Sequence, residues 1–116
     1  MKIERIYTGS DNQSHFESVE LQELSDDAGG VVTTLQSASG IMFNSWQVGR
    51  VADWHPAPRR QYLVVLSGRV EFEIGDGTKR QFGIGDVILA EDITGQGHIT
   101  RVIGNEPRSL MLVPLD

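Results

Sequence analysis

Short apolar runs separated by glycines dominate this sequence, and they limit what the chain can fold into more than any other feature. The chain has 13 glycines among 116 residues, spread in small clusters between the runs. No window of about 11 residues or more holds a helical period, and the nearest candidate, Phe16–Leu24, fits a strand equally well. Since glycine suits tight turns and short runs suit strands, the pattern predicts many short β-strands and little helix.

Ten segments have the composition and length of strands. They are Lys2–Tyr7, His15–Leu21, Val31–Gln36, Ile41–Val48, Gln61–Leu66, Arg69–Ile74, Lys79–Phe82, Val87–Ala90, Ile99–Ile103 and Ser109–Val113. In Val70–Ile74 apolar residues alternate with carboxylates, and the turn residues Asp76 and Gly77 predict a hairpin with Lys79–Phe82. Tyr62–Leu66 is apolar on both faces, which is typical of a strand in the middle of the structure. About ten short strands predict a sandwich or a closed barrel, because open sheets of that size curl or split.

Length, charge and cysteine content exclude several classes of protein. A chain of 116 residues predicts one domain, residues 1–116, because a second core would be too small. Lys and Arg number 10 against 16 Asp and Glu, a formal net charge of -6, which argues against nucleic-acid partners and membrane surfaces. The absence of cysteine, a charged N-terminal segment and the lack of a long apolar stretch predict a reducing, cytoplasmic location.

Polar side chains gather in the segment Trp54–Gln61, directly before the strand that is apolar on both faces. Two prolines in this segment bias the residues before them, His55 and Ala57, toward extended geometry. In an extended chain alternate side chains share a face, so His55, Arg59 and Gln61 point the same way. Ala57 lies between them and leaves a gap. Such polar groups are costly to bury without partners, which indicates the wall or rim of a wet cavity.

A second segment, Gly83–His98, brings another histidine to the start of a strand. A Gly-x-Gly-Asp turn leads into a short apolar strand, an acidic pair follows at Glu91 and Asp92, and a glycine-rich loop ends at His98. Neighbouring residues of an extended chain point to opposite sides, so a mechanism with paired carboxylates is not expected. The chain also lacks cysteine, a G-x-S-x-G turn and a phosphate-binding glycine loop, so no catalytic residue is assigned.

The two segments resemble the paired motifs of the cupin superfamily, small β-barrels that commonly hold a metal. The first family motif is H-x-H-x(3)-E-x(6)-G. Its positions fall on His55, Ala57, Gln61 and Gly68, so two of the four match with the spacing intact. The missing second histidine and the missing glutamate are replaced by alanine and glutamine.

The second cupin motif opens with a Gly-Asp turn, matched by Gly85 and Asp86, and closes with a histidine, matched by His98. Between them the usual proline-glycine segment is replaced by the longer stretch Glu91–Gly97. The resemblance covers roughly residues 40–113. It implies an all-β, cupin-like β-barrel, a double-stranded β-helix of the jelly-roll type.

By this resemblance His55, Gln61 and His98 are the candidate metal ligands. Imidazole is a strong ligand for divalent first-row metals, whereas a carboxamide is a weak one and alanine is none. The resemblance therefore implies a divalent transition metal that is weakly held. The alternative is that both histidines only form hydrogen bonds inside a polar pocket. The third histidine, His15, either approaches the pocket or lies at the surface.

Four further residues are candidates for ligand binding: Arg59, Trp46, Trp54 and Glu91. Arg59 shares a face with His55, and a planar guanidinium suits a carboxylate or phosphate, which indicates a small anionic ligand. The alternative for Arg59 is an ion pair with Glu91 or Asp92. The two tryptophans either floor the pocket or belong to the core.

Two functions are compatible with these residues. The first is a divalent-metal-dependent enzyme that acts on a small carboxylate- or carbonyl-bearing substrate, with the metal as a Lewis acid. The second is a non-catalytic, metal-free domain that binds or senses a small anionic ligand. Because cupin-like barrels often pair, and apolar stretches such as Leu110–Val113 need cover, we also expect a homodimer.

Overall fold

The computed structural model describes residues 1–116 as twelve strands without a helix. The strands are β1 (Lys2–Thr8), β2 (Ser14–Glu20), β3 (Glu23–Ser25), β4 (Val31–Thr33), β5 (Met42–Trp46), β6 (Val51–His55), β7 (Gln61–Ser67), β8 (Arg69–Glu73), β9 (Lys79–Phe82), β10 (Val87–Glu91), β11 (His98–Ile103) and β12 (Arg108–Pro114). No element has the helical length and apolarity needed to cross a membrane. The prediction of an all-β fold is confirmed.

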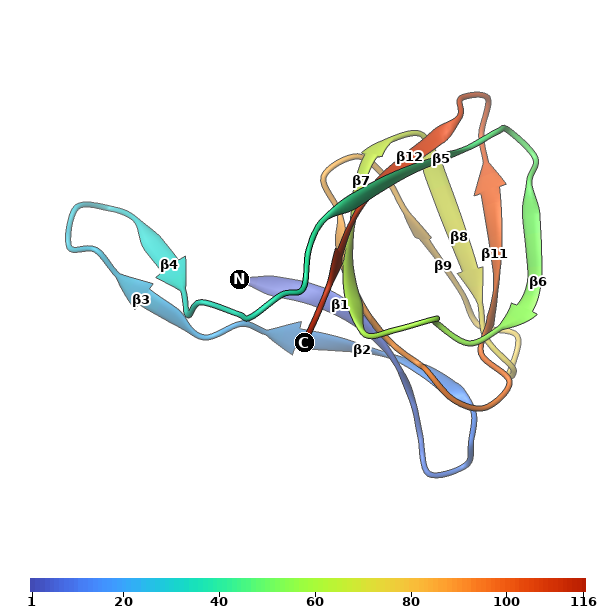
Figure 1. Ribbon diagram of the computed structural model, residues 1–116, viewed down its shortest axis with the longest axis horizontal. Helices are drawn as coiled ribbons and strands as arrows, with labels where there is room; N and C mark the ends of the chain where they lie inside the picture. Colours follow the sequence, from blue (N-terminus) through green and yellow to red (C-terminus); the bar gives the residue numbers. More distant parts are fainter.

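Two sheets face each other and form the barrel (Figure 1). The larger sheet has six strands in the order β2-β1-β10-β7-β12-β5, and the smaller has four in the order β6-β11-β8-β9. Strand β7 lies between β10 and β12, as expected for a segment that is apolar on both faces. The predicted hairpin of β8 and β9 is also present, with Gly77 in the left-handed conformation (φ 88) that its turn requires.

The core lies between the two sheets, because each sheet turns alternate residues toward the other. In β8 the inward residues are Val70 and Phe72, and in β12 they are Leu110 and Leu112. These four side chains belong to one buried cluster of 12 residues. The period-two alternation visible in the sequence therefore reports which face of each strand is buried.

Two strands differ from the expectation. β3 is a three-residue strand, too short to stand out in the sequence. β6 carries His55, and its residues do not alternate between buried and exposed, so no period-two pattern marks it. A register shift against β11 breaks the alternation: His98 pairs with His55 and Thr100 with Ala52, so β6 has one extra residue.

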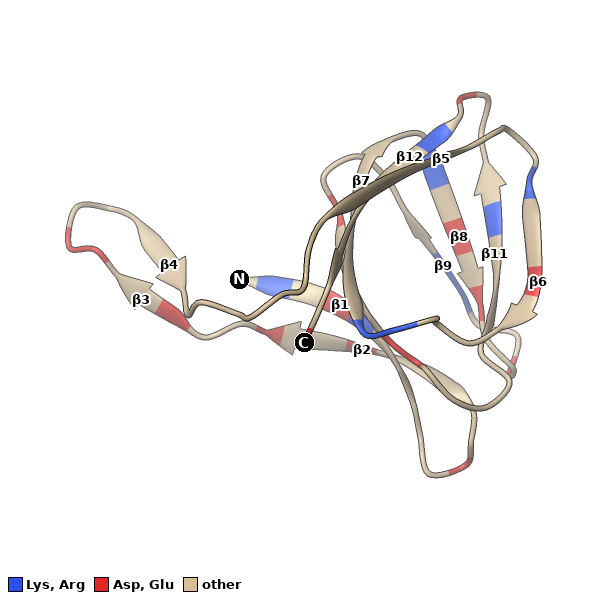
Figure 2. Cartoon of the chain, viewed as in Figure 1, with Lys and Arg blue, Asp and Glu red and all other residues tan.

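The hairpin of β3 and β4, which we call the arm, extends away from the barrel (Figure 1). Leu24 and Val32 face each other across it, and their exposed fractions are 52% and 60%. Figure 2 shows acidic residues on the arm and no Lys or Arg. A two-stranded hairpin is marginally stable in water by itself, so the arm needs another surface to cover its apolar side chains.

Candidate functional site

The interior of the barrel contains a cavity of about 410 Å³, which opens between the two sheets. His55, Ala57, Arg59 and Gln61 all line it, as the extended geometry of their segment predicts. His98 lines the same cavity from β11. The structure thus brings together the two histidines and the glutamine that the two sequence segments supply.

His55 and His98 lie side by side, because β6 and β11 pair at these two residues. Their ring centroids are 4.7 Å apart. Nδ1 of His55 donates to the carbonyl oxygen of Asp53 at 2.7 Å, so Nδ1 carries the proton. In the neutral ring Nε2 of His55 is therefore free to accept a hydrogen bond or to bind a metal in the cavity.

His98 is held by a buried carboxylate. Its Nδ1 donates to Oδ2 of Asp92 at 2.5 Å, and Oγ of Ser14 donates to the same oxygen at 2.7 Å. Asp92 has no exposed surface, and its Oδ1 has no hydrogen-bond partner. The backbone oxygen of Asp92 also accepts the N–H of Ala57 at 2.9 Å. Asp92 thus orients His98 and connects the segment Gly83–His98 to the segment Trp54–Gln61.

The donor groups do not fit a tightly held metal. No group of three or more His, Cys, Asp or Glu side chains in the chain could hold a metal ion. Oε1 of Gln61 accepts a hydrogen bond from Nη1 of Arg59 at 3.2 Å, and this guanidinium would repel a cation beside it. Two imidazoles remain, without the carboxylate that would offset the charge of a divalent ion.

Arg108 is the main residue of the cavity that sequence reasoning missed. Its exposed fraction is 2%, and it lines the cavity from the first position of β12. Nη2 of Arg108 donates to Oδ1 of Asn44 at 2.7 Å, whereas its buried Nε has no partner. Burial, together with a smaller effect of repulsion by Arg50, lowers the pKa of Arg108 to about 10. No carboxylate neutralises this guanidinium.

Trp46 lies between two guanidinium groups. The guanidinium carbon of Arg50 is 3.9 Å from the centroid of its ring, and that of Arg108 is 4.3 Å from it. All three side chains line the cavity. Cation–π contacts hold guanidiniums in place and leave their N–H groups free for a ligand. Of the two alternatives for Trp46, the cavity position is therefore correct.

The sequence contains a signal that would have identified Arg108. Residues Arg108, Leu110 and Leu112 alternate with less buried neighbours along β12. Because the two leucines point inward, parity places the arginine on the same face. An arginine on the apolar face of a strand is costly without a partner, and this cost marks a functional position.

Trp54 does not line the cavity, in contrast to its sequence assignment. The extra residue in β6 turns both Ala52 and His55 inward, and Trp54 stays outside with an exposed fraction of 37%. His15 also lies away from the cavity, where its Nε2 contacts Oδ2 of Asp11 at 2.8 Å. Of the two alternatives for His15, the surface position is correct.

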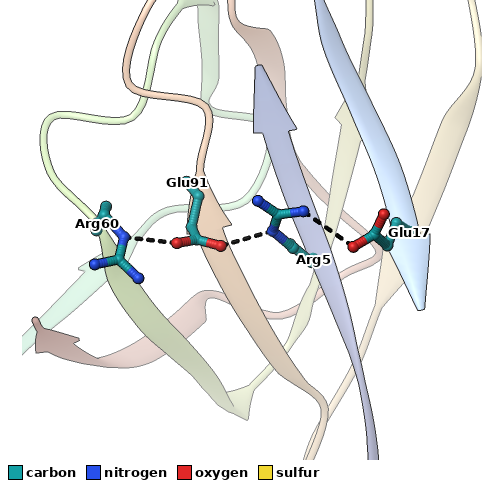
Figure 3. Close-up of polar contacts among 4 residues, drawn as sticks. All are labelled: Arg5, Glu17, Arg60 and Glu91. Atoms are coloured by element: carbon teal, nitrogen blue, oxygen red, sulfur yellow. Dashed lines mark hydrogen bonds and ion pairs between the residues drawn. The ribbon is translucent and has the colours of Figure 1, made fainter. Parts of the chain in front are cut away.

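Glu91 does not line the cavity either. Ala90 points into the cavity, so Glu91 points to the outer face of the sheet. There Nε of Arg5 and Nε of Arg60 each donate to Glu91 at 2.6 Å, and Arg5 also contacts Glu17 (Figure 3). Burial acts to raise the pKa of Glu91, but the hydrogen bonds and charges of the two arginines outweigh it and lower this pKa. The partners of Glu91 are therefore Arg5 and Arg60, and the alternative of an ion pair between Glu91 and Arg59 is wrong.

No protein-family model matches the chain, and no curated protein matches it. Solved structures do. The cupin domain of Schizosaccharomyces pombe Cnp3 is 14% identical with a TM-score of 0.54, over 100% of this chain and 83% of that one. NMB1881 from Neisseria meningitidis is 15% identical with a TM-score of 0.51, over 84% of this chain and 83% of that one. The conserved SPY1581 protein of unknown function from Streptococcus pyogenes is 21% identical with a TM-score of 0.50, over 72% of this chain and 70% of that one.

At these identities the likeness shows the fold, and function has to be argued from the site. The Cnp3 domain is similar over the whole of this chain, and its name states the fold. The absence of helices and the ten strands arranged in two facing sheets agree with it. The chain therefore has the cupin fold, and the prediction of a cupin-like barrel is confirmed.

Proposed function

We propose that this protein binds a small organic acid in the cavity of its barrel. The observation that carries the proposal is Arg108, a guanidinium with an exposed fraction of 2% and no carboxylate partner. A buried charge without a counter-ion costs several kcal/mol, to an order of magnitude. A bound carboxylate would supply the counter-ion, and the fork of a guanidinium matches its two oxygens.

The lining of the cavity supports an anion over a cation. Arg50 and Arg59 also line it, and no Asp or Glu does. In a site that is partly shielded from water, these charges attract an anion more strongly than they would at the surface. Apolar side chains such as Leu63 and Leu110 form the walls between the polar groups, which suits the carbon chain of an organic acid.

This proposal favours the metal-free alternative over the metal-dependent enzyme. The donor set of His55, His98 and Gln61 lacks a carboxylate, and Arg59 lies beside the glutamine. We therefore expect less than one equivalent of divalent metal in protein purified without chelators. A full equivalent of bound metal, measured by elemental analysis, would favour the metal-dependent enzyme.

Thermal unfolding tests the proposed function directly. Small carboxylates should raise the melting temperature, whereas their uncharged amides should not, because only the carboxylate neutralises Arg108. At a concentration of roughly 100 times Kd, the bound acid adds about 2.7 kcal/mol of stability. Arg108→Gln should abolish this shift. Arg101→Gln is the matched control, since Arg101 pairs with Glu71 and Glu73 outside the cavity. No shift with any acid would refute the proposed function.

We also propose that the protein is a homodimer in which the arm of each copy packs on the other. Eight residues separate the arm from β5, which begins at Met42 and has its own exposed apolar residue, Phe43 (67% exposed). A two-fold axis near the connecting segment would lay each arm over the β5 region of its partner, so both apolar surfaces would be covered.

Light scattering should give the mass of a dimer. A protein concentration of roughly tens of micromolar is suited to this measurement, because it detects an interface of ordinary affinity. Leu24→Asp combined with Val32→Asp should give monomers, because both side chains lie on the exposed part of the arm. Glu20→Gln, on the exposed end of β2, is the control and should leave the dimer intact. A monomeric wild-type protein would contradict this prediction.

A further inference from the structure

We propose that the ligand is a dicarboxylic acid that lies along the cavity, with one carboxylate on Arg108 and the other on Arg59. This inference rests on the proposed function and adds the class of acid and its orientation. It starts from the distribution of arginines between the surface and the cavity.

The arginines of this chain divide into two groups. Those with a carboxylate partner face outward and are Arg5, Arg60, Arg80 and Arg101. Those that line the cavity have no carboxylate partner and are Arg50, Arg59 and Arg108. Arg69 also lacks such a partner but lies in a separate surface groove. The acidic side chains of this protein thus neutralise the outer arginines and leave the cavity basic.

The charge around the cavity matches a ligand with two negative charges. Three guanidiniums and no Asp or Glu line the cavity, and the buried carboxylate of Asp92 is bonded to His98 in its wall. Three positive charges and one negative charge leave two positive charges uncompensated. A monocarboxylate would neutralise one of them, and a dicarboxylate would neutralise both.

The arginines lie at opposite ends of the cavity. At one end Arg50 and Arg108 both contact Trp46. At the other end Arg59 contacts Gln61, which begins β7. Ser67, the last residue of β7, pairs with Ser109 next to Arg108, so the two ends are six residues apart along β7, roughly 20 Å of backbone. Side chains from both ends shorten this span, and a linear acid would bridge it.

Arg108 and Arg59 differ in their exposure to water, which gives the ligand an orientation. Arg108 is buried, so the carboxylate bound to it loses more of its water and makes the stronger contact. Arg59 is an exposed residue at the rim of the cavity, so the second carboxylate stays close to solvent. The apolar walls between the two ends, which include Phe72, Leu110 and Leu112, contact the methylene chain.

Calorimetric titration of linear dicarboxylates, from succinate to suberate, tests the inference. Each diacid is compared with its half-amide, which keeps one carboxylate and the same length. We expect one chain length to bind best and to bind at least about tenfold more tightly than its half-amide, since hydrogen bonds to charged groups contribute that much. Equal affinity of diacid and half-amide at every length would overturn the inference while leaving the proposed function intact.

Two variants locate the carboxylates. Arg59→Gln should reduce the affinity of the best diacid to that of its half-amide and leave the half-amide unchanged. Arg108→Gln should weaken both ligands. Arg60→Gln is the matched control for Arg59→Gln, because the neighbouring Arg60 faces outward and pairs with Glu91. A diacid that keeps its advantage in Arg59→Gln would overturn the assignment of the second carboxylate.

Arg108→Met provides a second measurement that does not depend on the ligand. If Arg108 serves the ligand, its replacement by an apolar side chain should leave the melting temperature of the ligand-free protein unchanged or raise it, because a buried unpaired charge is removed. A large fall in that temperature together with retained acid binding would give Arg108 a structural role and overturn the inference.

Discussion

Ala57→His combined with Gln61→Glu should tighten the binding of nickel or zinc by several decades. Ala57 and Gln61 line the cavity together with His55 and His98, so the new imidazole and carboxylate would join two existing ligands. Mutation of a residue that only orients a metal ligand changes metal affinity by roughly 10- to 100-fold, and a residue that binds the metal itself contributes at least as much. Calorimetric titration of the double variant beside the wild type measures the gain.

Two controls assign this gain to the cavity. His98→Ala in the background of the double variant should weaken the metal again, because it removes one of the four ligands. Arg60→Ala in the same background should have little effect, because Arg60 lies on the outer face. Tight binding that survives His98→Ala would mean that the metal binds elsewhere.

Without metal, the same double variant should be less stable than the wild type. Its glutamate would lie in a partly dry cavity, where a carboxylate needs a positive partner. Arg59, which already contacts Gln61, would supply part of that charge. Zinc should therefore raise the melting temperature of the variant far more than that of the wild type. Equal shifts in both proteins would argue against a new site.

Asp92→Ala should lower the free energy of unfolding by about 3 kcal/mol, because it leaves the buried donors of His98 and Ser14 without an acceptor. For a domain of this size, the melting temperature should fall by roughly 10–20 °C. Glu91→Gln is the matched control. Its ion pairs with Arg5 and Arg60 lie on the outer face, where about 1 kcal/mol is expected.

A double-mutant cycle separates the role of Asp92 from simple loss of volume. With Ser14→Ala already present, Asp92→Ala should cost less than it does in the wild type, because one of the two unsatisfied donors is gone. The coupling should lie between about 0.5 and 3 kcal/mol. Additive losses in chemical denaturation would mean that the hydrogen bond from Ser14 contributes nothing to the stability of this region.

The fold class and one wall of the cavity follow from local patterns in the amino-acid sequence. Alternation in Val70–Ile74 and the apolar run of β7 report local backbone geometry, which depends on residues close together in the chain. The same holds for His55 and Gln61, because two prolines keep their segment extended and parity then sets their common face. The spacing of these residues also carried the resemblance to cupins.

Local sequence patterns predict the structure less well where the register between strands is irregular. The bulge in β6 hides that strand and moves Trp54 away from the cavity, although the residues around it look extended in the sequence. A bulge depends on how β6 pairs with β11, more than forty residues further along the chain. Its position therefore has no signature within β6 alone.

Which charges are neutralised, in contrast, depends on contacts that form in the folded barrel. Arg59 and Arg60 are adjacent and chemically identical, yet Arg60 forms an ion pair with Glu91 and Arg59 lines the cavity. Arg108 and Arg50 come from distant segments and reach the same tryptophan. The alternation of residues along a strand predicts that a side chain points inward. Which partner it contacts there depends on every strand of the barrel, because electrostatic interactions act between residues that only the closed fold brings together.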